Sequence, residues 1–347
     1  SLRIDKTKID RLLERVRREV DDGLLPSVQV ALAFRGEIIA EEAYGTVDER
    51  PANLEHRYCF FSATKPLVAA VVWQLVAERK IDVNEPVVSY YPEFSKAADE
   101  WKSAVTVEQV MLHTSGFPMA PLGPLVWGDR RARIEKMNSW RIDWKPGSRY
   151  IYHSTSAHWV LAELIERVTG HDYRDEVFVR ILEPLELPRL LGIKEDDQQD
   201  IVNLVGVGEE ATGDEMEEVF GIREIPDNGV TENLLMNFNH PETRAAGVPG
   251  GGGFGRARDL ALFYQALLHN TDGIWDAEIL ADAVSLVRNK LLDPMGTSAN
   301  RTLGLVQAGD DGFSHVRGFG RTVSAQAFGH NGAAGQLAWA DPDTGLS

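Results

Sequence analysis

Apolar side chains recur along this chain with the spacings that are typical of helices and strands. Near the N-terminus, a 3.6-residue spacing predicts an amphipathic helix over residues 9–20. Residues 28–34 and 37–44 are predicted to form two strands joined by a tight Arg-Gly turn. The stretch that begins at Ser62 has an apolar face so wide that it predicts a buried central helix.

The middle of the chain has a helical pattern, and sheet-like segments return near its end. Residues 156–168 form the clearest predicted helix, because Gly170 follows as a stop signal. Beyond residue 245 we expect a glycine-rich turn, a helix over 257–269, and strands over 325–330 and 336–340.

This order of elements predicts a discontinuous domain organisation. Residues 1–75 and 245–347 are expected to form one α/β sheet domain, and residues 76–244 a helical domain inserted into it. The active site is expected in the cleft between the two domains. Two regions, 117–140 and 195–240, carry no motif, and we expect their loops to shape substrate specificity.

Composition limits the classes of partner. With 43% apolar and 26% charged residues, the chain has the composition of a globular protein. Its net charge of −17 argues against nucleic acid or an anionic membrane as partner. Ten acidic and no basic residues lie between Glu195 and Glu218, which predicts a solvated surface insertion. No apolar run reaches membrane-spanning length and no secretory segment is present, so a cytoplasmic location is expected.

Metal, redox and nucleotide chemistry find little support. The single cysteine, Cys59, rules out internal disulfides and is expected to be a buried apolar residue. The nine histidines lack metal-ligand spacing, so we expect neither a metal nor a cofactor. Gly250, Gly252 and Gly255 match a dinucleotide-binding pattern formally, but no strand precedes them, which favours a tight backbone turn.

The chemistry begins at Ser62-Ala63-Thr64-Lys65, the one Ser-x-x-Lys in the chain. A serine hydroxyl attacks a carbonyl only when a nearby base takes its proton. Residues three apart share a helix face, so a helix that starts at Ser62 brings the Lys65 amine beside the hydroxyl. The same position places the serine amide at the positive end of the helix dipole.

Two further stretches supply candidate partners. Tyr152 follows a Trp-Lys-Pro-Gly loop, and its phenol near a lysine would serve as a proton carrier; the alternative is a core aromatic with a satisfied hydroxyl. In His330-Asn331-Gly332-Ala333, the glycine lets a substrate approach the backbone closely. The N–H of Ala333 is then a candidate oxyanion donor.

In order and context, these motifs resemble the serine β-lactamase and penicillin-binding-protein superfamily, most closely its class C-like β-lactamase-related esterase branch. The resemblance covers about residues 8–347 and includes a His-Thr-Ser-Gly turn and a Trp-x-Pro-Gly lead-in. The matching stretches are Ser62-Ala63-Thr64-Lys65, Leu112-His113-Thr114-Ser115-Gly116, Trp144-Lys145-Pro146-Gly147, Tyr152-His153-Ser154 and His330-Asn331-Gly332. It implies a β-lactamase/transpeptidase-like α+β fold, with an antiparallel sheet flanked by helices beside a helical domain.

The resemblance also implies roles. Ser62 would be the nucleophile, Lys65 and Tyr152 would share the proton transfers, and the N–H groups of Ser62 and Ala333 would form the oxyanion hole. An acyl-enzyme would form and water would release it. Ser154, His330, Asn331 and Gly332 would face the substrate, a small ester or amide.

Departures from the family pattern bear on the substrate. Ser154 replaces the asparagine that holds the amide side chain of β-lactams, and His330 replaces the lysine that pairs with their carboxylate. Histidine is mostly neutral near pH 7, so neutral esters are favoured. The alternatives are a β-lactamase, a D-amino-peptide hydrolase, or a non-catalytic penicillin-binding sensor. Relatives continue past the equivalent of Ser347 with a strand and a helix, so we expect either a sheet that lacks these elements or a sequence that is a truncated piece of a longer chain.

Overall fold

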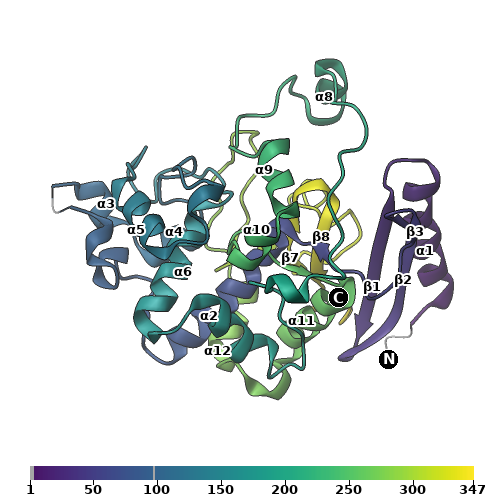
Figure 1. Ribbon diagram of the computed structural model, residues 1–347, viewed down its shortest axis with the longest axis horizontal. Helices are drawn as coiled ribbons and strands as arrows, with labels where there is room; N and C mark the ends of the chain where they lie inside the picture. Colours follow the sequence, from purple (N-terminus) through teal and green to yellow (C-terminus); the bar gives the residue numbers. More distant parts are fainter. Residues whose placement is uncertain (1–3, 97) are drawn as a thin grey trace.

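The computed structural model describes residues 4–96 and 98–347. Its chain opens with helix α1 (Lys6–Asp21) and the antiparallel hairpin of β1 (Ser27–Phe34) and β2 (Glu37–Val47), which the short β3 (Arg50–Pro51) extends. The predicted first helix and hairpin are confirmed. These elements form one side of the molecule in Figure 1. On the opposite side gather α3 (Glu100–Ala104), α4 (Val107–Met111), α5 (Arg130–Ser139) and α6 (Ser156–Thr169).

The C-terminal strands lie between these two regions. β7 (Phe328–Gly332) pairs antiparallel with β6 (Val306–Gln307) and β8 (Gln336–Ala340). Both predicted C-terminal strands are present, although β7 begins three residues later than expected. Leu346 forms bridges to Phe34 and to Asp341, and so connects β1 to the end of β8. An apolar groove of about 310 Å³ lies between these two strands.

Helix α2 (Lys65–Ala77) is the buried centre of the fold. Apart from Gln74, its residues from Lys65 to Leu75 are buried, because α6, α12 and β7 all pack against it. Trp73 donates from Nε1 to the backbone carbonyl of Leu303, 2.8 Å away, and this bond ties the helix to the segment before β6. The predicted central helix is confirmed, and it provides a rigid base for the residues that precede it.

Helices dominate the middle of the chain, as expected. The predicted helices over 156–168 and 257–269 are confirmed as α6 and α11, and Gly170 ends α6 in the left-handed region at φ 75°. The α-helices that follow α2 in the described residues are α3 (Glu100–Ala104), α4 (Val107–Met111), α5 (Arg130–Ser139), α6 (Ser156–Thr169), α7 (Tyr173–Val177), α8 (Gly213–Phe220), α9 (Glu232–Met236), α10 (Pro241–Ala246), α11 (Ala257–His269) and α12 (Ala277–Ser285). The division into two domains remains a prediction.

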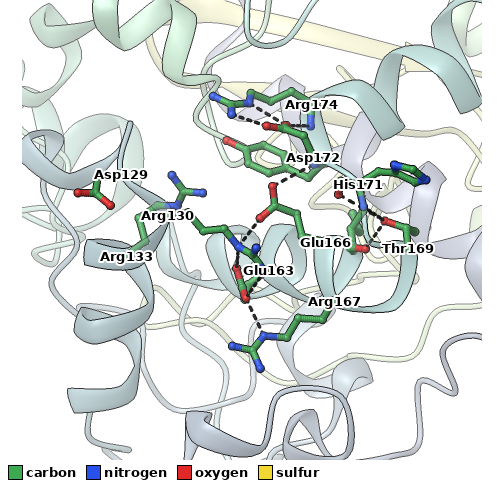
Figure 2. Close-up of polar contacts among 12 residues, drawn as sticks. Asp129, Arg130, Arg133, Glu163, Glu166, Arg167, Thr169, His171, Asp172 and Arg174 are labelled. Atoms are coloured by element: carbon green, nitrogen blue, oxygen red, sulfur yellow. Dashed lines mark hydrogen bonds and ion pairs between the residues drawn. The ribbon is translucent and has the colours of Figure 1, made fainter.

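A buried ion-pair network holds α5 and α6 together (Figure 2). The carboxylate of Glu163 is 2% exposed and accepts hydrogen bonds from Arg130, at 3.0 and 3.1 Å, and from Arg167, at 2.6 Å. Arg130 also lies 2.7 Å from Glu166, whose pKa is raised by burial. These ion pairs therefore link the start of α5 to α6.

Several local predictions can be checked against the described residues. The Cys59 thiol is buried, as expected, and burial raises its pKa to about 12. The glycine run is a tight turn, in which the N–H groups of Gly251 and Gly252 both donate to the carbonyl of Val248. Across residues 4–96 and 98–347, no helix has the length and apolar composition of a membrane span. In that part of the chain, His, Cys, Asp and Glu side chains form no group that could hold a metal ion.

Candidate active site

Ser62 lies on a short 3-10 turn, Phe61–Thr64, rather than inside the α-helix. The expectation that Ser62 opens the helix is therefore wrong by one turn, since α2 begins at Lys65. Phe61 has φ 46°, a left-handed conformation that is strained for a bulky residue, and its buried ring holds it there. The turn leaves Ser62 half-buried, with its hydroxyl facing Lys65.

The amine of Lys65 is 1% exposed and has three polar neighbours. Its Nζ lies 3.2 Å from Oγ of Ser62, and 2.7 and 2.6 Å from the carbonyl oxygens of Ser154 and Gly250. A Cβ at Gly250 would lie 3.2 Å from the carbonyl oxygen of Ser154, so a larger residue would fit tightly beside the second carbonyl that contacts Lys65. Burial, and then the charge of Arg301, lower the pKa of Lys65 well below its ordinary value.

Tyr152 faces the same amine, with Nζ of Lys65 5.0 Å from its ring centroid. The phenol has no hydrogen-bond partner in the described residues, and burial raises its pKa, whereas Arg301 and the adjacent Ser62 hydroxyl oppose that rise. The His-Thr-Ser-Gly turn positions this residue. The ring of His113 packs 4.7 Å from that of Tyr152, and its Nδ1 accepts from the N–H of His153 at 2.9 Å.

His330 is buried and neutral, as the sequence predicts. Its Nδ1 lies 2.6 Å from the carbonyl oxygen of Asn331, which can only accept, so Nδ1 carries the proton. Nε2 then accepts from Nη1 of Arg301 at 3.3 Å. Burial, and the charges of Arg301 and Lys65, lower the pKa of His330 well below its ordinary value. The side chain of Asn331 is exposed.

The end of β7 lies against the serine turn. A Cβ at Gly332 would lie 2.2 Å from the carbonyl oxygen of Phe60 and 3.2 Å from Cβ of Phe61, so glycine alone fits there. Ala333 follows directly. Among the turn, loop and inter-segment backbone hydrogen bonds of the described residues, none has the N–H of Ser62 or of Ala333 as donor. The oxyanion role of these two N–H groups remains a prediction.

The sequence reasoning missed Arg301. This arginine lies 29 residues before His330 in an irregular segment, where no local motif marks it. The fold places its Cζ 4.9 Å from the ring centroid of Tyr152, and Nε donates to the hydroxyl of Tyr150 at 3.0 Å. A permanent positive charge thus lies next to His330, although the sequence pattern, with histidine in place of lysine, indicated none there.

A cavity of about 250 Å³ is lined by Ser154, the residue whose carbonyl oxygen contacts the Lys65 amine. No charged side chain lines it, and Trp127 and Leu234 are among its apolar walls. Ser154 is at its edge; its hydroxyl donates to the carbonyl of Asn228 at 3.2 Å and so engages the loop that follows α8. Residues from both 117–140 and 195–240, the regions in which we expected specificity loops, line this cavity. Trp127 is itself buried, whereas Trp101 is exposed and is not among the lining residues.

Comparison with known proteins identifies the family. A family model described as Beta-lactamase matches residues 12–347. The chain belongs to the beta-lactamase family. It is thus a serine hydrolase, in agreement with the resemblance inferred from its motifs. A curated relative from Salmonella agona, provisionally named as a D-alanyl-D-alanine carboxypeptidase, is 26% identical and aligns with 97% of this chain and 81% of its own length.

Solved structures confirm the fold class. A penicillin-binding-protein homologue from Caulobacter crescentus superimposes with a TM-score of 0.77 at 24% identity, over 97% of this chain and 89% of the other. A family VIII carboxylesterase gives a TM-score of 0.77 at 23% identity, with the same two coverages. This chain therefore has the β-lactamase-like α+β fold that its motifs imply.

Proposed function

We propose that this serine hydrolase is a carboxylesterase-type enzyme that cleaves small esters through an acyl-enzyme on Ser62. The observation that carries the proposal is the environment of Lys65. Two carbonyl oxygens, of Ser154 and Gly250, lie within hydrogen-bond distance of its amine, and Oγ of Ser62 lies 3.2 Å away. A neutral amine has two N–H groups and one lone pair. The carbonyls take the N–H groups, and the lone pair is left for the serine proton.

Acylation then proceeds as follows. Oγ of Ser62 attacks the ester carbonyl while Nζ of Lys65 accepts the hydroxyl proton. The N–H groups of Ser62 and Ala333 stabilise the negative oxygen of the tetrahedral intermediate. When the carbon–oxygen bond to the alcohol breaks, the proton passes from Lys65, by way of the Tyr152 phenol, to the leaving oxygen. The products of this step are an alcohol and an acyl-serine.

Deacylation uses the same groups in reverse. Water attacks the acyl-serine carbonyl, and its proton passes to the Tyr152–Lys65 pair. Collapse of the second tetrahedral intermediate breaks the bond to Oγ, which recovers a proton from Lys65. The products are a carboxylic acid and the original Ser62. General acid–base transfers of this kind typically accelerate a reaction about 10²–10⁴-fold.

Esters are favoured because Ser154, unlike the asparagine it replaces, offers no side-chain amide to a substrate's acylamino group. The hydroxyl of Ser154 is already engaged with the carbonyl of Asn228. The adjacent cavity is uncharged and has a volume of about 250 Å³, which suits a compact apolar substituent. The likeness in fold to a family VIII carboxylesterase is compatible with this substrate class.

A second candidate is hydrolysis of an amide that carries a carboxylate, such as a β-lactam or a D-amino peptide. Arg301 favours it, because its guanidinium supplies a fixed positive charge beside His330. The name of the Salmonella relative points the same way.

A substrate panel distinguishes the two candidates. We expect p-nitrophenyl esters to be hydrolysed with higher kcat/KM than nitrocefin or a D-alanyl-D-alanine peptide. The Ser62→Ala variant should lose about 10³-fold or more of the ester activity. Ser89→Ala, an exposed serine near Glu85, is the matched control. Preference for nitrocefin or the peptide would support the second candidate, and full ester turnover by Ser62→Ala would exclude Ser62 as nucleophile.

A further inference from the structure

Arg301 has an unusual environment for an arginine. It is 6% exposed, yet in the described residues no carboxylate forms an ion pair with it. Its neighbours are the Tyr150 hydroxyl, the neutral His330 ring and the face of Tyr152. A buried, uncompensated charge is costly, and such charges concentrate at functional sites.

The backbone holds Arg301 rigidly. It forms bridges to Asn289 and Val306, and the side chain of Asn289 donates to the carbonyl of Leu112, the residue before His113. Two residues later, Leu303 is bonded to Trp73 of α2. The guanidinium is therefore fixed relative to both the helix that carries Lys65 and the turn that supports Tyr152.

The charged and titratable groups around Tyr152 come from five segments. The ring faces Lys65 from α2, at 5.0 Å, and Arg301, at 4.9 Å. Imidazole rings complete the surroundings, and His158 stacks on His113 behind the phenol. These imidazoles are His113, His153, His158 and His330, and burial lowers the pKa of all four. The permanent charge nearest the phenol is consequently that of Arg301.

We infer that Arg301 is an electrostatic positioning residue, whose fixed charge against Tyr152 favours the deprotonated forms of Lys65 and Tyr152 and so sets the pH range in which Ser62 is activated. This inference deepens the proposed function and rests on its nucleophile. Arg301 itself touches no reacting atom. It acts through the two residues that carry the proton.

The test measures the pH dependence of covalent labelling. Wild type, Arg301→Gln and Arg301→Lys are each treated with a fluorophosphonate, and the rate of adduct formation is followed by intact mass. For Arg301→Gln we expect the rise of the labelling rate with pH to move to higher pH by about one to two pH units. Labelling should be about 10- to 100-fold slower than in wild type near pH 7 and should recover at alkaline pH. Arg301→Lys keeps the charge and should stay close to the wild-type profile.

A control variant identifies a merely structural effect. Arg133→Gln removes another buried guanidinium, one that donates to the carbonyl of Trp127, and should leave the profile in place. A loss for Arg301→Gln that is equal at every pH would overturn the inference. So would an unchanged profile combined with a higher KM restricted to substrates that carry a carboxylate, because Arg301 would then be a substrate anchor.

A second measurement does not depend on the nucleophile. The tyrosinate absorbance of the protein minus that of its Tyr152→Phe variant isolates the ionisation of Tyr152. We expect this step at higher pH in an Arg301→Gln background than in the native one. If Tyr152 ionises at the same pH in both backgrounds, the inference is overturned even if ester hydrolysis is confirmed. If Tyr152 ionises at higher pH in the Arg301→Gln background, the inference is supported even if esters prove not to be the substrate.

Discussion

Lys65 and Lys102 are two buried lysines whose amines each contact two backbone carbonyls, but of the two only Lys65 has a serine hydroxyl within hydrogen-bond distance of its amine. Nζ of Lys102 lies 2.8 and 3.1 Å from the carbonyl oxygens of Met137 and Asn138, and burial lowers its pKa to about 8. Lys65 contacts two carbonyls in the same way and adds Oγ of Ser62 at 3.2 Å. The chain thus contains its own control for the proposed base.

Replacing each lysine by methionine should separate chemistry from stability. Lys65→Met removes the acceptor of the serine proton, and we expect kcat to fall about 10²–10⁴-fold. Lys102→Met leaves the site intact, so kcat should stay within about threefold of wild type, even if the melting temperature changes. Steady-state kinetics on one ester with both folded variants makes the comparison. Equal losses in the two variants would contradict the role of Lys65.

Changing Ser154 tests why esters are favoured. Ser154→Asn introduces a side-chain amide and should raise the ratio of nitrocefin to ester turnover by about tenfold, the value of one hydrogen bond of about 1–1.5 kcal/mol. Ser154→Ala removes the bond to Asn228 without adding an amide, so it should not raise that ratio. If both variants raise the ratio of nitrocefin to ester turnover equally, the choice of substrate depends on the lost hydrogen bond to the Asn228 loop and not on recognition by an amide.

Local patterns in the sequence predicted a large part of this architecture. The first helix, the hairpin, α6, α11 and the three motif segments follow from periodicity, stop signals and spacing. The 3-10 turn at Ser62 was not predictable, because it depends on the strained conformation of Phe61 in its buried pocket. Arg301 was also missed, since its role arises from contacts with Tyr150 and His330, which are distant in sequence.

The Glu163 network should contribute strongly to stability. Glu163→Gln removes the charge that pairs with Arg130 and Arg167, and we expect a loss of about 1–3 kcal/mol in the free energy of unfolding. Glu135→Gln is the control, because its pair with Arg131 is exposed and should change stability by no more than about 0.5 kcal/mol. Denaturant unfolding of both variants tests this difference, and equal effects would contradict it.

Acid stability should depend on Asp311. Hydrogen bonds from Arg317 lower the pKa of this carboxylate to about 2. A pKa lower in the folded than in the unfolded state stabilises the fold above the unfolded value of about 3.9, and this contribution is lost as the pH falls toward 2. Asp311→Asn should therefore flatten the fall in melting temperature below about pH 5. An unchanged slope would show that the pair contributes nothing to acid stability.

Mapping the covalent adduct tests the central claim most directly. The protein is treated with a fluorophosphonate, digested, and analysed by peptide mass spectrometry in parallel with the Ser62→Ala variant. We predict a single adduct on the peptide that contains Ser62, absent from Ser62→Ala, with ester hydrolysis lost in proportion to labelling. An adduct on another residue, or full ester hydrolysis by protein labelled at Ser62, would contradict this account.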